Sequence, residues 1–374
     1  MFTTIIIFII VLSVLVFAHE LGHFWVAKRF GLKPKEFGFG MPPRIFGFYK
    51  NVEGKWQKVR GNKMPDDAAD TIYSINWLPL GGFVALGEDE GPSADPNHFQ
   101  NKAAWKRFLI LSAGVTMNII LAAFLLSAGY MIGLPQAIDA DDSRASVSER
   151  KIQISQVLPD SPAAQAGLAA GDVILSIDEQ EFIASEELQK YVDGHTGQKI
   201  AYRIRRGQDD MQFELVPELR ADTARGGIGI AITETGIVKY SFFYAIWNGL
   251  KLTFFMTWFI IVAFFDLIKG LVMGHGISVE LGGPVRIAQI TGDAARMGFA
   301  YLINFSAILS INLAIINALP FPALDGGRIM FIALEKIMRR PLKRELEGTI
   351  HYIGFVLLMI MVALVTYKDI ARLF

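Results

Sequence analysis

The segment His19 to His23 reads HELGH and holds the residue types of a hydrolytic metal site. On a helix, two histidines four residues apart lie on one face, so both imidazoles can bind one zinc ion. Glu20, between them, can take a proton from a water that the metal activates. The chain has no cysteine, so any metal must be held by His, Asp or Glu. The pattern predicts a zinc-dependent hydrolase.

A catalytic zinc ion keeps three protein ligands and one open position. Glu36 and Glu53 follow the histidines, but both lie in Gly-, Pro- and Lys-rich surroundings without a helical pattern. Asp325 is the other candidate, at the end of the stretch 317–327, NALPFPALDGG. Its prolines and glycines force non-helical backbone at membrane depth, which is tolerated only inside protein or beside water. A carboxylate there must meet a cation, so we expect Asp325 to complete the site.

These residues lie at the ends of apolar blocks. The chain has 374 residues, 52% of them hydrophobic and only 19% charged, unlike an ordinary soluble protein. Its zero net charge leaves no electrostatic footprint for nucleic acid. Four uncharged blocks are long enough to span a membrane, namely Phe2–Ala18, Phe108–Ile138, Met297–Leu324 and Gly348–Tyr367. A fifth, Leu252–Phe265, is short and rich in aromatic neighbours, which favours a helix at the outer interface.

Basic residues set the orientation. They concentrate between the first two spans and in the short loop between the last two, so both regions should be cytoplasmic. Four spans satisfy this pattern with both termini outside, and a fifth span at 252–265 would break it. His23 and Asp325 then lie at the cytoplasmic ends of their spans and can meet at one depth.

Two segments differ from the spans. Trp77–Leu86 is too short to cross a membrane and too apolar for a simple loop, and Gly81 and Gly82 lie at its centre. We expect a membrane-dipping β-hairpin whose edge can bind an extended substrate, or otherwise a packed loop with a glycine turn. Residues 151–220 alternate between polar and apolar in several short runs, which indicates one small soluble domain.

The stretch from Val157 to Asp178 resembles the bacterial PDZ signature. PDZ domains bind extended peptides by strand addition, and Gly226–Ile230 could receive the carboxylate of a peptide C-terminus. The alternative is a domain that binds nothing and only restricts access.

The motifs together resemble the site-2 protease family of intramembrane zinc metalloproteases, in particular bacterial regulator-of-sigma-E proteases. The likeness rests on HELGH, on NALPFPALDGG, and on the stretches 76–84 (NWLPLGGFV) and 281–286 (LGGPVR). It implies that His19, His23 and Asp325 bind zinc, that Glu20 is the catalytic base and that Asn317 holds the substrate backbone or the oxyanion. The family's Gly-Pro-x-x-Asn element keeps Gly114 and Asn118 here but has Val115 for proline, and we assign Asn118 to substrate binding with Asn317, Gly81 and Gly82.

The predicted fold is a polytopic α-helical membrane protein with about four transmembrane helices, a membrane-dipping β-hairpin and one inserted PDZ-like α+β domain. The expected parts are 1–138 (spans 1 and 2 with the hairpin), 151–234 (periplasmic PDZ-like domain), 235–296 (interfacial helix and connector) and 297–374 (spans 3 and 4). The resemblance implies a multi-pass protein of the bacterial inner membrane. It implies single-span substrates in the bilayer, such as an anti-sigma factor already cut outside.

Two rival functions remain from the sequence. One is a non-catalytic membrane adaptor with a relic metal site, which the intact Glu20 disfavours. The other is a metal transporter, which usually shows internal repeats that this chain lacks.

Overall fold

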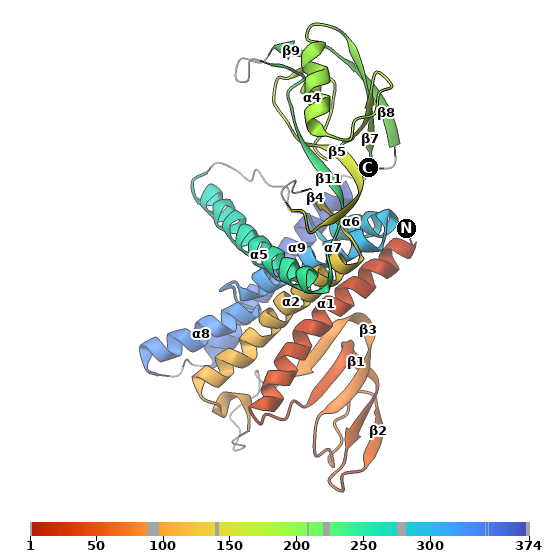
Figure 1. Ribbon diagram of the computed structural model, residues 1–374. Coiled ribbons are helices and arrows are strands. Elements are labelled where there is room, and N and C mark those ends of the chain that lie inside the picture. Colours follow the sequence, from red (N-terminus) through yellow and green to blue (C-terminus); the bar gives the residue numbers. More distant parts are fainter. Residues whose placement is uncertain are drawn as a thin grey trace. The chain divides into compact units, whose positions relative to one another are not determined.

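The computed structural model describes residues 2–87, 97–138, 142–207, 209–219, 225–274, 282–340, 342 and 344–371 (Figure 1). The chain forms two compact units. Unit 1 comprises Met1–Ala128 and Ile246–Phe374, and unit 2 comprises Gly129–Ala245. Part of the predicted connector, 275–281, lies outside the described residues, as do 208 and 220–224 of the predicted PDZ-like domain.

Within the described residues, five helices are long and apolar enough to cross a membrane. They are α1 (Phe2–Arg29), α2 (Ala104–Ile132), α5 (Phe242–Val272), α7 (Phe299–Ala318) and α9 (Arg344–Ala371). Shorter helices are η1 (Phe99–Asn101), α6 (Pro284–Met297) and α8 (Asp325–Met338). The chain is thus a multi-pass membrane protein. How many of the helices cross the membrane stays a prediction.

Helix α5 is much longer than the uncharged block 252–265. Its 31 residues continue through Lys251 and Asp266, because a single charge interrupts hydropathy without interrupting the backbone hydrogen bonds of a helix. At 1.5 Å per residue it is about 46 Å long, more than the ~30 Å of hydrocarbon that a spanning helix needs to cross. The length of α5 is therefore compatible with both a position at the membrane interface and a position across the membrane.

The neighbours of α5 in unit 1 lie at one end of that unit. Helices α1 and α2 run antiparallel, since His23 lies beside Ile110 and His19 beside Asn118. Gly249 near the start of α5 packs on Ser127, towards the end of α2 and hence near the N-terminal end of α1. Helix α6 contacts that same end of α1, where a Cβ on its Gly292 would clash with Thr4. The last turn of α9 reaches this level too, because Asp369 accepts hydrogen bonds from the main-chain N–H groups of Gly283 and Arg286, at 3.3 and 2.9 Å.

A small sheet in unit 1 packs against α1, as Figure 1 shows. It contains β1 (Glu36–Lys50), β2 (Trp56–Arg60) and β3 (Ile72–Ala85), in the order β2-β1-β3. Both β1 and β3 are bent, so residues 36–39 of β1 pair with 72–75 and also with 82–85 of β3. The predicted hairpin 77–86 thus begins within β3, which turns at Gly81, where φ is +77°. A hairpin that dips into the membrane stays a prediction.

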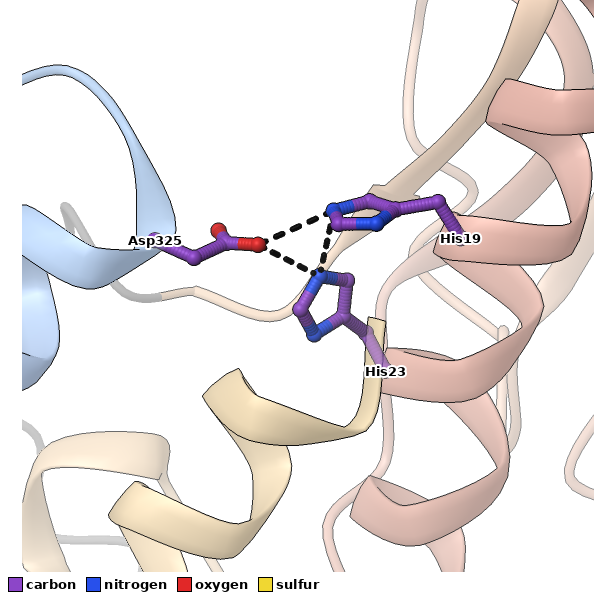
Figure 2. A group of neighbouring side chains, drawn as sticks. All are labelled: His19, His23 and Asp325. Carbon is purple, nitrogen blue, oxygen red and sulfur yellow. Dashed lines mark hydrogen bonds and ion pairs between the residues drawn. The ribbon is translucent and has the colours of Figure 1, made fainter. Parts of the chain in front are cut away.

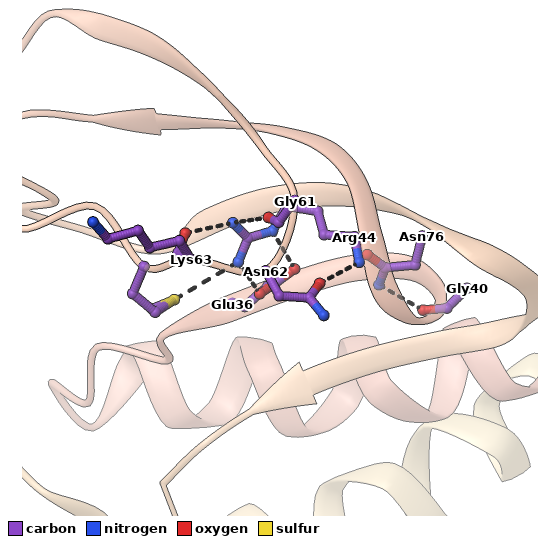
Figure 3. Close-up of polar contacts among 8 residues, drawn as sticks. Glu36, Gly40, Arg44, Gly61, Asn62, Lys63 and Asn76 are labelled. Carbon is purple, nitrogen blue, oxygen red and sulfur yellow. Dashed lines mark hydrogen bonds and ion pairs between the residues drawn. The ribbon is translucent and has the colours of Figure 1, made fainter.

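An ion pair buried in this sheet fixes the bend of β1 (Figure 3). The Arg44 guanidinium binds both carboxylate oxygens of Glu36 and also donates to the main-chain oxygens of Gly61 and Lys63. The Arg44 N–H donates to Asn62 Oδ1 at 2.7 Å. Because a buried charge is costly without partners, these contacts tie the bend to the loop after β2. Glu36, one candidate third metal ligand, is therefore engaged elsewhere.

The turn of β3 is fixed to α1 by a single serine. Ser13 Oγ donates to the Pro79 oxygen at 2.8 Å and accepts from the Gly81 N–H at 3.2 Å. Gly81 and Gly82 lie so close to α1 that a Cβ would clash with Val16 and crowd Phe17 and Glu20. The strand that follows, 82–85, is thereby held beside Glu20.

Unit 2 is a β-sheet domain with two short helices. Its six-stranded antiparallel sheet has the order β4-β11-β5-β6-β7-β8. The strands are β4 (Leu134–Ala137), β5 (Ser146–Val157), β6 (Val173–Ile177), β7 (Ile200–Arg206), β8 (Asp209–Leu215) and β11 (Ile230–Lys239), with a two-stranded ribbon of β9 (Glu218–Leu219) and β10 (Gly226–Gly227). Helices α3 (Pro162–Gln165) and α4 (Ser185–Gly194) complete it, and its core is mainly isoleucine around Tyr202. The alternating runs between 151 and 220 form strands in the structure, in β5, β6 and β7 among others.

Candidate functional site

Three side chains of types that can bind a metal, from the two ends of the chain, meet in unit 1 (Figure 2). His19 and His23 project from one face of α1, with their Nε2 atoms 3.1 Å apart. Asp325 Oδ2 lies 2.9 Å from Nε2 of His19 and 3.2 Å from Nε2 of His23. Both imidazoles are buried, with 6% and 4% of each residue exposed. Two imidazoles and one carboxylate that point at one spot match the ligand set of a catalytic zinc ion.

The break between α7 and α8 carries Asp325 to the histidines. Helix α7 ends at Ala318, and Ala323 has a φ of +79° before α8 begins at Asp325. Gly326 and Gly327 lie so close to main-chain atoms of residues 318–322 that a Cβ at either would clash. His351 Nδ1 of α9 accepts the Ala323 N–H at 2.9 Å. The glycines are therefore needed because α8 starts tightly against the end of α7.

Helix α2 forms the opposite wall of the site. His23 Nδ1 lies 2.8 Å from the main-chain oxygen of Ile110, so this nitrogen carries the hydrogen and Nε2 is left to bind a metal. Gly114 faces both imidazoles, and a Cβ there would clash with His23 and His19. Asn118 lies one turn further along α2, fully buried, with Nδ2 3.3 Å from Nδ1 of His19.

A cavity of about 400 Å³ opens onto this cluster. Its walls include His23 and Asp325 of the cluster, together with Glu20 and Ala323. Residues 83–87, at and just after the end of β3, also line it. Arg328 also lines it, one helical turn after Asp325. The cavity therefore combines a carboxylate able to accept a proton, a metal-binding cluster and the edge of a β-strand.

The structure separates the predicted site residues into groups. His19, His23 and Asp325 come together, Glu20 lines the cavity beside them, and Gly82 packs on Glu20. The other predicted substrate-binding residues are not among the described residues that line the cavity. Asn118 is buried against His19, Gly81 packs on α1, and Asn317 near the end of α7 is not among the described residues that line the cavity. Glu53 pairs with Lys55 at the surface.

Sequence reasoning missed Arg328, and it named Asn118 as a substrate-binding residue without foreseeing its contact with His19. The sequence could have indicated Arg328, because it lies three residues after Asp325 and therefore on the same face of a helix. The contact of Asn118 with His19 could not be read from the sequence, because it depends on how α2 packs against α1.

Comparisons with known proteins agree with this geometry. The sequence profile described as peptidase family M50 matches residues 7–59 and 63–361. The zinc metalloprotease RasP of Geobacillus kaustophilus is 31% identical over 447 aligned positions, covering 99% of this chain and 98% of that protein. The regulator of sigma-W protease RasP of Bacillus subtilis is 29% identical, covering 99% of each protein.

Among solved structures, one that matches is the PDZ domain of an SdrC-like protein from Listeria monocytogenes, at 27% identity and a TM-score of 0.22. The match covers 23% of this chain and 92% of that domain. The family match covers most of the chain and agrees with the resemblance seen in its motifs. This chain belongs to peptidase family M50, the site-2 protease family.

Proposed function

We propose that this intramembrane zinc metalloprotease cuts its substrates at a metal ion held by His19, His23 and Asp325, with Glu20 as the catalytic base. The convergence of three ligand atoms from α1 and α8, all within 4.8 Å of one another, carries the proposal. The cavity beside them supports it, because it exposes Glu20 next to the ligands. An adaptor or a transporter would not need a proton acceptor there.

The side chains of this chain divide the reaction among them. A zinc ion at the cluster would polarise the scissile carbonyl and lower the pKa of water. Glu20 takes the proton of the water that attacks the carbonyl carbon, and later delivers it to the leaving nitrogen. The main-chain oxygen of Ile110 orients the imidazole of His23 so that its Nε2 can bind the metal. His23 is also buried, so bulk water has little access to its imidazole.

The end of β3 is suited to hold the substrate backbone. Among the described strands, residues 82–85 pair with β1 on one side only, and residues 83–87 line the cavity. A helical substrate hides its carbonyls in its own hydrogen bonds, so it must unwind before cleavage. An unwound segment can then pair with the unoccupied edge of β3, which aligns it past Glu20. Arg328 lines the same cavity, and its guanidinium is suited to donate hydrogen bonds to such a segment.

The substrates we propose are single-span membrane proteins of the anti-sigma-factor type, already shortened by another protease. Support comes from the Bacillus subtilis relative, whose name is regulator of sigma-W protease. In unit 2, a groove of about 540 Å³ lies along α4 and the chain from 225 to 232, beside Leu188 and Val192. We assign it to a PDZ-type domain in the periplasm, where it binds a peptide C-terminus or excludes substrates that keep a folded outer domain.

Cleavage by the purified full-length chain tests the proposal. A single-span substrate without its outer domain should be cut, and mass spectrometry should locate the cut within or beside the span. Removal of metal with a chelator should abolish cleavage, and zinc but not magnesium should restore it, because imidazole ligands favour zinc. Cleavage that persists in metal-free protein would disprove the assignment.

We further propose four spans in the bacterial inner membrane, with the metal cluster towards the cytoplasm and α5 at the outer face. The arrangement of unit 1 supports this, because α5 starts beside Ser127 and the chain returns to the same end of the unit at Gly283. Cysteines introduced singly at Ser241 and Met273 should both react with an impermeant reagent added outside. The chain has no native cysteine to add background. Labelling from opposite sides would instead show that α5 spans the membrane.

Asn118 serves, in this proposal, to hold His19 rather than the substrate. Metal binding through Nε2 requires a hydrogen on Nδ1 of His19. Asn118 can accept it through Oδ1, for which the described residues provide no other partner, once its amide turns by 180°. Asn118→Leu should therefore weaken zinc binding by about 10- to 100-fold, measured by competition with a chelator. Asn118→Asp, which keeps an acceptor, should weaken it far less.

Ser310→Ala provides the matched control for Asn118. Ser310 is fully buried and donates to the main-chain oxygen of Asn118 at 2.8 Å, so this change disturbs the same packing but spares the amide side chain. Its zinc affinity should stay near that of the wild type. Equal losses in Asn118→Leu and Ser310→Ala would assign the effect to helix packing.

A further inference from the structure

One face of the β1–β3 sheet is aromatic at its centre and cationic at one edge. Residues directly opposite each other on paired strands share a face. The pairing therefore places a set of aromatic and aliphatic side chains together, namely Phe37, Phe39, Phe46, Phe48, Tyr73 and Ile75. It also places Arg60 opposite Phe46, Lys58 opposite Phe48, and Lys50 opposite Trp56. We call these residues the aromatic–cationic face.

A cavity of about 280 Å³ lies on the aromatic part of this face. Phe17 of α1 closes one side of it, and Phe17 and Phe24 contact Phe37, with ring centres 5.4 and 4.4 Å apart. The rest of the face is not covered by α1. Phe39, Phe48 and Ile75 remain 42%, 45% and 43% exposed. A cavity lined by so many rings accepts an apolar chain.

Three basic side chains border the aromatic part. Lys58 Nζ lies 5.2 Å from the ring centre of Phe46, and Lys50 Nζ lies 5.3 Å from that of Trp56. Both ammonium groups thus lie over aromatic rings, and both lysines remain exposed. Within the part of the chain that the structure describes, neither lysine nor Arg60 forms an ion pair with an acid. Their positive charge is thus available to an anion.

The position of the face along α1 matches the membrane surface. Tyr73, in the same cross-strand row as Phe48 and Lys58, accepts a hydrogen bond from Lys28, in the last turn of α1. The basic end of a spanning helix marks the headgroup level. The turn of β3, in contrast, is fixed to Ser13, fifteen residues or about 22 Å back along α1. The face therefore runs from the headgroup level into the hydrocarbon.

We infer that the aromatic–cationic face is a binding site for an anionic phospholipid. Lys50, Lys58 and Arg60 bind its phosphate, and an acyl chain lies on the rings of the 280 Å³ cavity. A peptide strand does not suit this face, because strand addition uses the main-chain groups at the edge of a sheet and a sheet face presents side chains instead. The face offers only side chains, apolar beside basic, which is the chemistry of an acyl chain beside a phosphate.

Native mass spectrometry of the full-length protein in detergent tests the inference. Titration with phosphatidylglycerol should show at least one bound lipid of higher affinity than any phosphatidylcholine bound under the same conditions. Lys50→Gln with Lys58→Gln should weaken phosphatidylglycerol binding by about 30-fold and leave phosphatidylcholine binding unchanged, because two charges near the phosphate are lost. Phe48→Gln should weaken the binding of both lipids, since it removes acyl contacts.

The matched control removes two lysines outside the face. Lys55 pairs with Glu53 in the turn before β2, and Lys33 donates to the Ala69 oxygen. Lys33→Gln with Lys55→Gln changes the net charge equally and should keep phosphatidylglycerol affinity. All variants should retain wild-type zinc content, which reports an intact fold. Equal affinity for the two lipids, equal losses in both double variants, or displacement of the lipid by an acidic peptide would each overturn the inference.

Discussion

The Glu20→Gln variant should cleave its substrate about 10²- to 10⁴-fold more slowly than the wild type while it keeps its zinc. Glutamine has nearly the shape of glutamate, so the packing of Gly82 against this side chain is preserved. It cannot accept a proton, however, so the attacking water loses its proposed base. Single-turnover cleavage together with the zinc content per chain measures both effects.

The control for Glu20 is Glu335→Gln. Glu335 lies on α8, where it pairs with Arg107 at 2.9 Å, and it does not line the cavity. This change also removes one carboxylate charge from unit 1 and should leave the cleavage rate close to that of the wild type. If Glu20→Gln lost zinc along with activity, Glu20 would be a ligand or a structural residue, and the assignment of the base would fail.

Asp325→Ala should lose most of its zinc. Structural zinc sites with four ligands have binding free energies of about 10–16 kcal/mol, which is about 3–4 kcal/mol per ligand. Loss of one ligand should therefore lower the zinc affinity by about 10²- to 10³-fold. His23→Ala should have an effect of the same size, because both side chains converge on one point. Equilibrium competition with a chelator of known zinc affinity gives the measurement.

Glu36→Gln is the informative control, since the sequence alone left Glu36 as a candidate third ligand. In the structure its carboxylate binds Arg44, and the two residues are buried together. We expect Glu36→Gln to keep wild-type zinc affinity even if it destabilises the sheet. Wild-type zinc binding by Asp325→Ala, with a loss in Glu36→Gln, would exchange the roles of the two acids.

The three side chains that meet in unit 1, His19, His23 and Asp325, could be picked out from the sequence because their chemistry is local. Two histidines at helical spacing share one face of any helix that contains them. The prolines and glycines around Asp325 indicate a break in the helix at membrane depth. The strands of unit 2 were predictable for a similar reason, since alternation along each strand records which face is buried. Each of these signals is contained in a short stretch of sequence.

The sheet of unit 1 was not predictable beyond the segment around Gly81. Residues 33–64 are rich in Gly, Pro and Lys and suggest loops, yet 36–39 become a strand between two halves of β3. That pairing joins residues up to 49 positions apart, such as Glu36 and Ala85, and the buried partner of Arg44 depends on it. The length of α5 was missed because Lys251 and Asp266 interrupt hydropathy but not the helix.

The separation of the metal ligands along the chain has a consequence for biosynthesis. His19 and Asp325 meet across 306 residues, so the ribosome completes most of the protein before the third ligand exists. A nascent chain that has inserted only α1 and α2 holds two histidines and the base but no complete ligand set. With the proposed ligand set, we expect activity only after Asp325 at the start of α8 has been synthesised, so a partly made chain should not cut membrane proteins.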